Sequence, residues 1–284
     1  MGSKGKNQKG EMSQIARHLV PTRFGQIHCR ETGDGPAIVL LHINQQSSAL
    51  YLELLERLAP ALRAIAIDYP SHGMSDHISF QPGVPDYADC VVEVLDGLGI
   101  ERFAALGEAT GAAVAIELGC RFAARVEALV LLNCPIYRDR AHADVVHAPL
   151  KSDLRPSDPS GFPLTRTLEF MLEKDQSHAP LHPDQSWMDR INVAQIEAGR
   201  HRWQALDALN AYDIGGKLGQ LDRDTLLLMG EHFHYTPLLD EYRRRIPKLV
   251  AADVIPQARF CMGWEKADVV ASRVIAFLAQ RRAA

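Results

Sequence analysis

Hydrophobic and polar positions follow two rhythms along the chain. Short runs of apolar residues alternate with longer stretches in which apolar residues return at every third or fourth position. The first pattern is typical of buried strands, the second of amphipathic helices. The predicted strands are Ile27–Glu31, Ala37–His42, Arg63–Asp68, Phe103–Leu106, Ala128–Asn133, Thr225–Met229 and Leu249–Ile255. The predicted helices are Ala49–Leu58, Tyr87–Leu98, Ala112–Phe122, Leu238–Ile246 and Ala267–Arg281.

This alternation predicts an α/β fold with a mostly parallel central sheet flanked by helices. The rhythm breaks at Pro135, where a proline-rich stretch leads into a long helical pattern from Ser186 to Asn210, and it resumes at Thr225. We therefore expect three parts. They are a core of residues 19–134 and 216–284, a helical cap inserted at residues 135–215, and an expression-tag remnant or disordered tail at residues 1–18.

Composition is that of an ordinary globular protein, with 284 residues, 46% of them hydrophobic, and a formal net charge of -4. This balance favours neither nucleic acid nor an anionic membrane as a partner. Residues 1–11 contain no apolar segment of the kind found in signal peptides. The five cysteines are an odd number and widely spaced, so we expect free thiols in a cytoplasmic protein. No motif for a metal ion or a cofactor is present, and none is predicted.

The stretch from Leu106 to Ala112 carries the clearest chemical signal. The sequence Gly-Glu-Ala-Thr-Gly follows an apolar strand and precedes a helix of small residues. This is the context of the G-x-S-x-G turn, which raises a nucleophilic serine above the end of a sheet. The central position here is Ala109, whose methyl group cannot attack a carbonyl or hold a proton.

Five segments in order resemble the signature segments of the α/β-hydrolase superfamily, and the resemblance extends from about Leu19 to Leu278. It implies that fold with a helical cap. Leu40–Asn44 resembles the L-L-H-G-x loop, Asp68–Asp76 the D-x-x-G-H-G-x-S-D turn and Leu106–Ala112 the nucleophile elbow. Leu226–Glu231 resembles the L-L-x-x-G-E strand end, and Ile255–Glu265 the I-P-x-x-G-H segment that ends in W-E.

Carried over position by position, the resemblance implies a degenerate catalytic triad. The nucleophile position holds Ala109, the acid position three residues after Gly230 holds Phe233, and the histidine position four residues after Pro256 holds Phe260. A Ser-His-Asp device needs a nucleophile, a base and a group that orients the base. A single Ser→Ala change would alter position 109 only, so three departures favour a natural divergence.

The resemblance leaves an oxyanion site in place, because backbone donors do not depend on side-chain identity. The amides of Asn44 and Thr110 would form it. Gln45, which follows Asn44, is expected either to line the pocket mouth or to cap the next helix. Asn44 also resembles the asparagine of the H-G-N-P loop in haloalkane dehalogenases, although Ala109 cannot carry out their reaction.

Three side chains are candidates for moving a proton. His232 and His234 flank Phe233 on the loop that normally presents the acid, and Glu108 directly precedes the elbow position. For the histidines, the alternative is a solvated loop position. For Glu108, it is a side chain that points behind the sheet.

Three functions remain open. The first is an enzyme that acts on a small carbonyl- or carboxylate-bearing molecule by non-covalent acid/base or oxyanion-stabilised chemistry, as a lyase, cyclase or decarboxylase would. The second is a pseudo-hydrolase that binds a small apolar ligand without turnover. The third is a Ser→Ala variant of an ordinary ester or C–C hydrolase. In each case the partner is a small molecule, and a homo-oligomer is compatible with the sequence.

Overall fold

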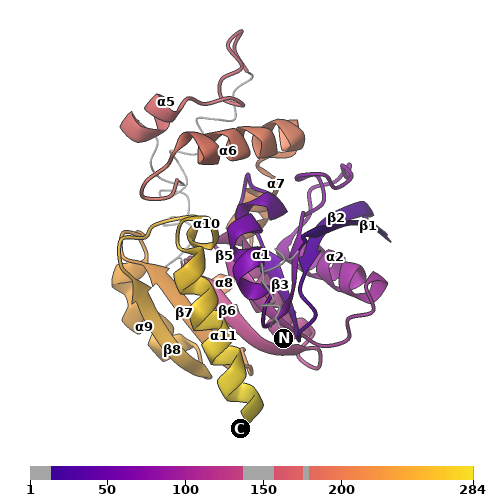
Figure 1. Cartoon of the computed structure of the whole chain (residues 1–284), viewed down its shortest axis with the longest axis vertical. Helices are drawn as coiled ribbons and strands as arrows, with labels where there is room; N and C mark the ends of the chain where they lie inside the picture. Colours follow the sequence, from indigo (N-terminus) through magenta and orange to yellow (C-terminus); the bar gives the residue numbers. More distant parts are fainter. Residues whose placement is uncertain (1–13, 137–156, 175–178, 284) are drawn as a thin grey trace, which may run out of the picture.

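The computed structural model describes residues 14–136, 157–174 and 179–283, and residues 1–13 of the expected tail lie outside this set. Within the described residues, one eight-stranded sheet has the order β1-β2-β4-β3-β5-β6-β7-β8 (Figure 1). Strand β2 is antiparallel to β1 and β4, and the other neighbours are parallel. The strands are β1 (Ala16–Thr22), β2 (Gly25–Thr32), β3 (Ala37–Leu41), β4 (Arg63–Ile67), β5 (Phe103–Glu108), β6 (Val126–Leu132), β7 (Thr225–Gly230) and β8 (Leu249–Ile255).

All seven predicted strands are present, and the α/β prediction is confirmed. Strand β1 was not predicted, because it is an edge strand in which only Val20 is buried and charged residues interrupt the apolar pattern. Its pairing with β2 places residues 16–18 in the sheet, so their assignment to a tail was wrong.

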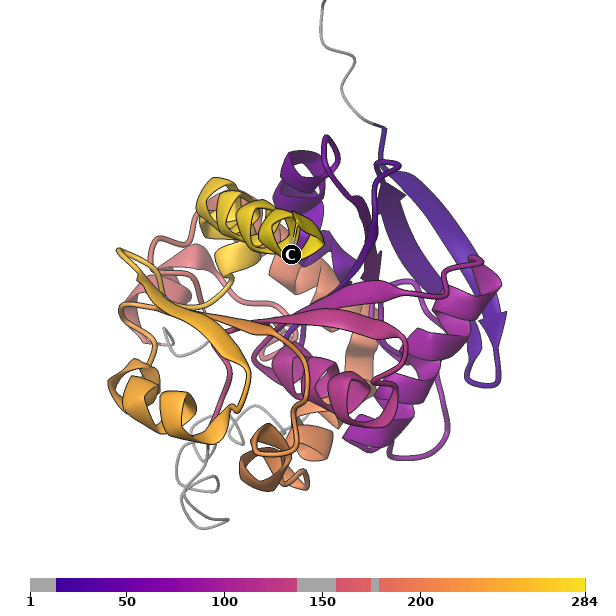
Figure 2. The ribbon, with the colours of Figure 1, turned by 90° about the horizontal axis from the view of Figure 1, so that it is seen from below.

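Helices cover both faces of the sheet. Helices α1 and α11 pack together on one face, and α2, α3 and α8 lie on the other (Figure 2). The helices of the core are η1 (Ser48–Tyr51), α1 (Leu52–Leu58), α2 (Val84–Gly97), α3 (Thr110–Arg121), η4 (Thr236–Leu238), α9 (Leu239–Arg245), α10 (Met262–Glu265) and α11 (Ala267–Ala283). This arrangement buries β5 and most of β6, as their apolar sequences predict.

The segment between β6 and β7, called the insertion below (residues 135–215), carries helices joined by turns and loops in its described part. Residues 137–156 and 175–178 lie outside the described set. Helices α5 and α6 lie beyond the carboxyl ends of the strands (Figure 1). The described helices from here to β7 are α5 (Leu168–Glu173), α6 (Gln185–Ala198), η3 (Gly199–His201), α7 (Gln204–Asn210) and α8 (Ile214–Leu218).

The single long helix expected from Ser186 to Asn210 was wrong. The helix ends at Gly199, which has a φ of 53°, and α7 starts a new direction after Trp203. A positive φ cannot continue a right-handed helix, and glycine adopts it without a steric cost.

The five cysteines are free, and all but Cys120 are buried, which agrees with the expected free thiols. Among the described helices, none is long and apolar enough to cross a membrane.

The turn from β5 into α3 brings backbone segments into close approach. A Cβ atom on Gly111 would lie 1.9 Å from the carbonyl oxygen of Leu41, and one on Gly107 would lie 2.0 Å from the carbonyl oxygen of Gly111. Only glycine fits at such positions. The two outer glycines of the elbow sequence are therefore required by packing.

We expect Gly111→Ala to lower the free energy of unfolding by about 3 kcal/mol or more, because β3 and α3 must separate to admit the methyl group. Urea unfolding followed by circular dichroism measures this change. Gly219→Ala is the matched control, since its nearest atoms would lie 3.9 Å away. Equal stability of the two variants would contradict the expectation.

Candidate functional site

Ala109 lies on a sharp turn between β5 and α3, with φ 50° and ψ −107°. Such a backbone conformation is strained for a residue with a side chain. Its neighbours hold it in place, because the Ala109 amide donates to the Leu132 carbonyl at 3.0 Å and the Ala109 carbonyl accepts from Ala112 N at 3.0 Å. The turn has the geometry expected of a nucleophile elbow, and Thr110 begins the helix behind it.

The loop after β3 lies against the insertion. The side-chain oxygen of Asn44 accepts a hydrogen bond from the backbone of Leu206 in α7 at 3.1 Å. The side-chain amides of Gln45 and Gln195, the latter in α6, are hydrogen-bonded at 3.0 Å. Gln45 also has a positive φ of 61°. Two of the predicted ligand-binding residues, Asn44 and Gln45, therefore anchor the insertion with their side chains. Thr110, the third, is buried.

Phe233 and Phe260 contact each other. Phe233 follows β7, Phe260 lies between β8 and α10, and both are buried. Their ring centroids are 5.0 Å apart with planes at 85°, an edge-to-face arrangement. The two residues that the resemblance equates with the acid and the histidine of a triad are thus neighbours in space.

The histidines of the same loop are exposed. The centroid of the His234 ring lies 4.5 Å from that of Phe233 and 6.0 Å from that of Phe260, and its plane is tilted by 48° and 49° to theirs. His232 instead lies beside Glu231, with Nε2 at 3.7 Å from Oε2. Of the two, His234 is the one that contacts the aromatic pair.

Glu108 is fully buried, and its carboxylate faces Asn133 and α10. Oε1 accepts hydrogen bonds from Asn133 Nδ2 at 2.9 Å and from the backbone of Met262 at 3.2 Å. Burial raises the pKa of Glu108 from 4.5 to about 7, although the hydrogen bonds from Asn133 and the backbone of α10 act in the opposite direction. The carboxyl group therefore changes its charge near neutral pH.

Asn133 joins three loops at the carboxyl edge of the sheet. Its Nδ2 also donates to the carbonyl of Arg259, and its Oδ1 accepts from the amide of Gly230 at 2.9 Å. The residue is fully buried with a φ of 44°, a conformation that asparagine tolerates. These contacts tie the ends of β5, β6 and β7 to the segment after β8.

A buried imidazole–carboxylate pair does occur, between His28 Nδ1 and Asp68 Oδ2 at 2.8 Å. Strands β3 and β4 separate β2, which carries His28, from the elbow strand β5. Asp68 also accepts from the backbone amides of Ser48 at 2.5 Å and Met74 at 2.9 Å. Burial raises the pKa of Asp68, but the hydrogen bond and charge of His28 outweigh it and lower the pKa below its usual value. These contacts brace the loops after β3 and β4.

His42 and His72 serve the same loops. His42 Nε2 accepts from the backbone of Tyr69 at 3.2 Å, and His72 Nδ1 lies 3.1 Å from the carbonyl of Pro70. Burial lowers the pKa of His72 to about 3, so its ring is neutral at ordinary pH. In the described residues, no group of three or more His, Cys, Asp or Glu side chains is arranged to hold a metal ion.

A family comparison agrees with this architecture. Residues 38–273 match the model of the alpha/beta hydrolase family. The chain belongs to the alpha/beta hydrolase family.

Relatives within this family match over most of their length. Haloalkane dehalogenase 2 of Mycobacterium tuberculosis is 25% identical over 266 residues, which cover 88% of this chain and 91% of the relative. The 2-hydroxy-6-oxo-6-phenylhexa-2,4-dienoate hydrolase of Comamonas testosteroni is 25% identical over 281 residues, 90% and 92% of the two chains. The crystal structure of a membrane phospholipase A, a bacterial virulence factor, has a TM-score of 0.78 at 18% identity, covering 95% and 87%.

Sequence reasoning missed two residues of this alpha/beta hydrolase that organise the site. Asn133 was predicted only as the last residue of a strand, although a polar residue at the end of the apolar run Ala128–Leu132 is a signal of a buried hydrogen-bond network. Gln195 was not singled out, yet it lies on the buried face of α6 together with Trp187 and Ile191. A polar residue on an apolar helix face requires a partner, which is here Gln45.

The raised pKa of Glu108 predicts a pH-dependent stability. A raised carboxyl pKa means that the folded protein holds the proton more tightly than the unfolded chain. This contribution is complete below about pH 4.5 and is lost as the pH rises through about 7. Glu108→Gln cannot ionise, so its stability relative to wild type should rise by up to about 3 kcal/mol between about pH 5 and about pH 8.

Urea unfolding of both proteins at the two pH values measures this difference. Glu101→Gln, at an exposed position, is the control and should show no such change. A Glu108→Gln offset that stays constant with pH would contradict the assigned burial of the charge.

Proposed function

We propose that this protein binds a small carbonyl- or carboxylate-bearing molecule at the Ala109 elbow and acts on it without a covalent intermediate. The observation that carries the proposal is the strained backbone at Ala109, with φ 50° and ψ −107°. Strain of this kind costs about 1–3 kcal/mol and is maintained where the local geometry serves a site. A methyl group cannot use the elbow for attack, but the backbone amide of Thr110 that follows it does not depend on the side chain at position 109.

The chemistry available is oxyanion stabilisation. In this family such a site uses the amide after the nucleophile position and an amide of the loop after the first central strand, here those of Thr110 and Asn44. Two such donors stabilise a developing negative charge by about 3 kcal/mol. That suits proton transfer, carbon–carbon cleavage or closure, elimination and decarboxylation, the reactions of lyases, cyclases and decarboxylases.

Two buried donors support a ligand that carries hydrogen-bond acceptors. Gln46 Nε2 and Trp203 Nε1 have no hydrogen-bond partner among the described residues. Gln46 lies two residues after Asn44 and Trp203 three residues before Leu206, so the two donors belong to the two segments that the Asn44–Leu206 hydrogen bond joins. An unsatisfied buried donor costs about 1–3 kcal/mol, which a ligand carbonyl or carboxylate would recover.

The contact between Phe233 and Phe260 supports a natural divergence from Ser-His-Asp hydrolysis. Two rings in edge-to-face contact replace a polar pair with an apolar one, which a single substitution at position 109 would not produce. This favours the non-covalent reading over a Ser→Ala variant of an ordinary hydrolase.

His234 is the proposed proton carrier. It lies against Phe233 and near Phe260, at centroid distances of 4.5 and 6.0 Å, whereas the Glu108 carboxylate is bonded to Asn133. An imidazole with access to solvent exchanges protons near neutral pH.

We expect His234→Ala to lower turnover of a responsive substrate by about 100-fold or more, and His232→Ala to leave it unchanged. The substrates are a set of small keto acids and aryl carboxylates, first selected by thermal shift and then followed by chromatography. His232 is the matched control because it is a neighbouring exposed histidine that pairs with Glu231. Equal turnover in the two variants would remove His234 from the mechanism.

A second candidate function is ligand binding without turnover. It is favoured by the apolar Phe233–Phe260 pair and by the inward-bonded Glu108, since neither supplies a base. The same experiment separates the two functions. A compound that stabilises the wild-type protein and is recovered unchanged supports a binding protein, and a consumed compound supports an enzyme.

Restoring the triad tests the position assignment. Ala109→Ser alone should leave hydrolysis of p-nitrophenyl acetate at the wild-type background, because Phe260 cannot accept a proton. The variant Ala109→Ser/Phe233→Asp/Phe260→His should raise it by about 100-fold or more. Circular dichroism melting verifies that the triple variant is folded. Strong activity of Ala109→Ser by itself would show that another base serves the elbow.

A further inference from the structure

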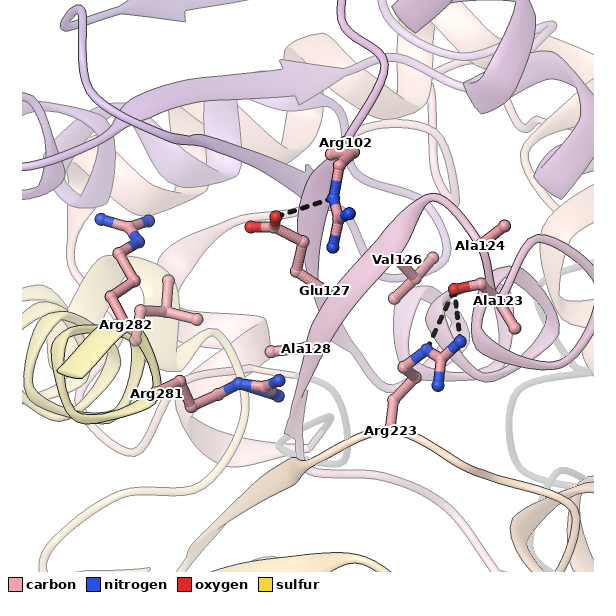
Figure 3. A pocket seen from close by; sticks show the side chains of 10 residues that line it. Arg102, Ala123, Ala124, Val126, Glu127, Ala128, Arg223, Arg281 and Arg282 are labelled. Carbon is pink, nitrogen blue, oxygen red and sulfur yellow. Dashed lines mark hydrogen bonds and ion pairs between the residues drawn. The ribbon is translucent and has the colours of Figure 1, made fainter. Parts of the chain in front are cut away.

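A cavity lies at the amino ends of strands β5 and β6, whereas Ala109 follows the carboxyl end of β5. It has a volume of about 500 Å³ and is formed where β5 and β6 begin, beside the loop before β7 and the end of α11 (Figure 3). Four arginines from three parts of the chain line it, namely Arg102, Arg223, Arg281 and Arg282. Nothing in the proposed chemistry at the elbow uses this cavity.

The cavity has more arginines than carboxylates to pair with them. Arg102 pairs with Glu127 at 3.0 Å, and Arg281 pairs with Asp224 at 3.1 Å. Arg223 donates two hydrogen bonds to the carbonyl of Ala123, at 3.0 and 2.7 Å.

The remaining nearby carboxylate is already neutralised. Asp222 lies 3.7 Å from Arg223 but is bound by Lys248 at 2.5 Å. Four guanidinium groups therefore share only two carboxylates, Glu127 and Asp224, which pair with Arg102 and Arg281. This leaves an excess of positive charge around the cavity.

The cavity also has apolar lining residues. They are Val126 and Ala128 of β6 and Leu278 of α11. A volume of this size is within the range of small-molecule sites, and apolar side chains beside charged ones fit the uncharged part of a ligand. Guanidinium groups bind phosphate oxygens through paired N–H donors.

We propose that this arginine cavity binds a small organic molecule that carries phosphate groups, at a site separate from the elbow. The charged part of such a ligand would lie against Arg281 or Arg282 in the last turn of α11, whose side chains point in different directions (Figure 3). At Arg281 it would compete with Asp224. Arg223 donates both hydrogen bonds to the Ala123 carbonyl and forms part of the wall.

The test measures binding of ADP, AMP and adenosine to the full chain by isothermal titration calorimetry. Affinity should fall in that order, because phosphate oxygens are the recognised groups. Arg281→Gln/Arg282→Gln should weaken ADP binding by about tenfold or more. Arg273→Gln is the matched control, since it lies on the same helix, pairs with Asp253 at 3.5 Å and does not line the cavity.

Several outcomes decide the proposal. Loss of binding in the double variant, with normal binding in Arg273→Gln and in Ala109→Ser, supports a phosphate site independent of the elbow. Absence of ADP binding by the wild type, or equal weakening in Arg273→Gln, would overturn it. So would equal binding of adenosine and ADP. Melting without ligand should change little in the double variant, because an ion pair at this partly exposed position contributes little to stability.

Discussion

The side-chain amide of Asn133 is the interaction on which the rest of the site depends. From one buried position it bonds to the Glu108 carboxylate, the Gly230 amide and the Arg259 carbonyl. Each of these groups terminates or follows a different strand, and Glu108 and Gly230 are buried. A buried polar group without its partner costs about 1–3 kcal/mol, so one amide fixes the relative positions of three loops.

Backbone strain is concentrated at the same edge of the sheet. Six described non-glycine residues have a positive φ, and each of them follows the carboxyl end of a strand. They are Gln45 after β3, Ser71 after β4, Ala109 after β5, Asn133 after β6, and Gln257 and Cys261 after β8. Strained residues of this kind gather at binding and catalytic sites. In open α/β sheets, ligands generally bind outside the carboxyl ends of the strands, where these residues lie.

Several of the side chains around that backbone are apolar or point into the scaffold. Phe233 and Phe260 fill adjoining positions with a ring–ring contact, and the Glu108 carboxylate serves the scaffold behind the turn. The insertion forms further hydrogen bonds with the segment that follows β8. Arg259 donates to the carbonyls of Ala179 and Pro180, and Glu265 accepts from the amides of Leu181 and His182. The segment after β8 thus holds the insertion to the core and the core to Asn133.

The sequence by itself determined the fold class, seven strands and the place of the elbow, because apolar periodicity and the spacing of glycines are local properties of the chain. Gly107 and Gly111 could be recognised in the sequence as part of the elbow, and the structure shows that only glycine fits their contacts. Strand β1 and the end of helix α6 at Gly199 were not predicted. An exposed edge strand and a single residue with positive φ both leave only a weak pattern in the sequence. Only the tertiary structure decided the directions of polar side chains. It turned Glu108 toward Asn133, set Gln45 against Gln195 and brought Phe233 to Phe260, contacts across 25, 150 and 27 residues of chain. The arginines that line the arginine cavity are likewise far apart in the sequence, from position 102 to position 282. They meet because the last turn of α11 lies beside the amino ends of β5 and β6.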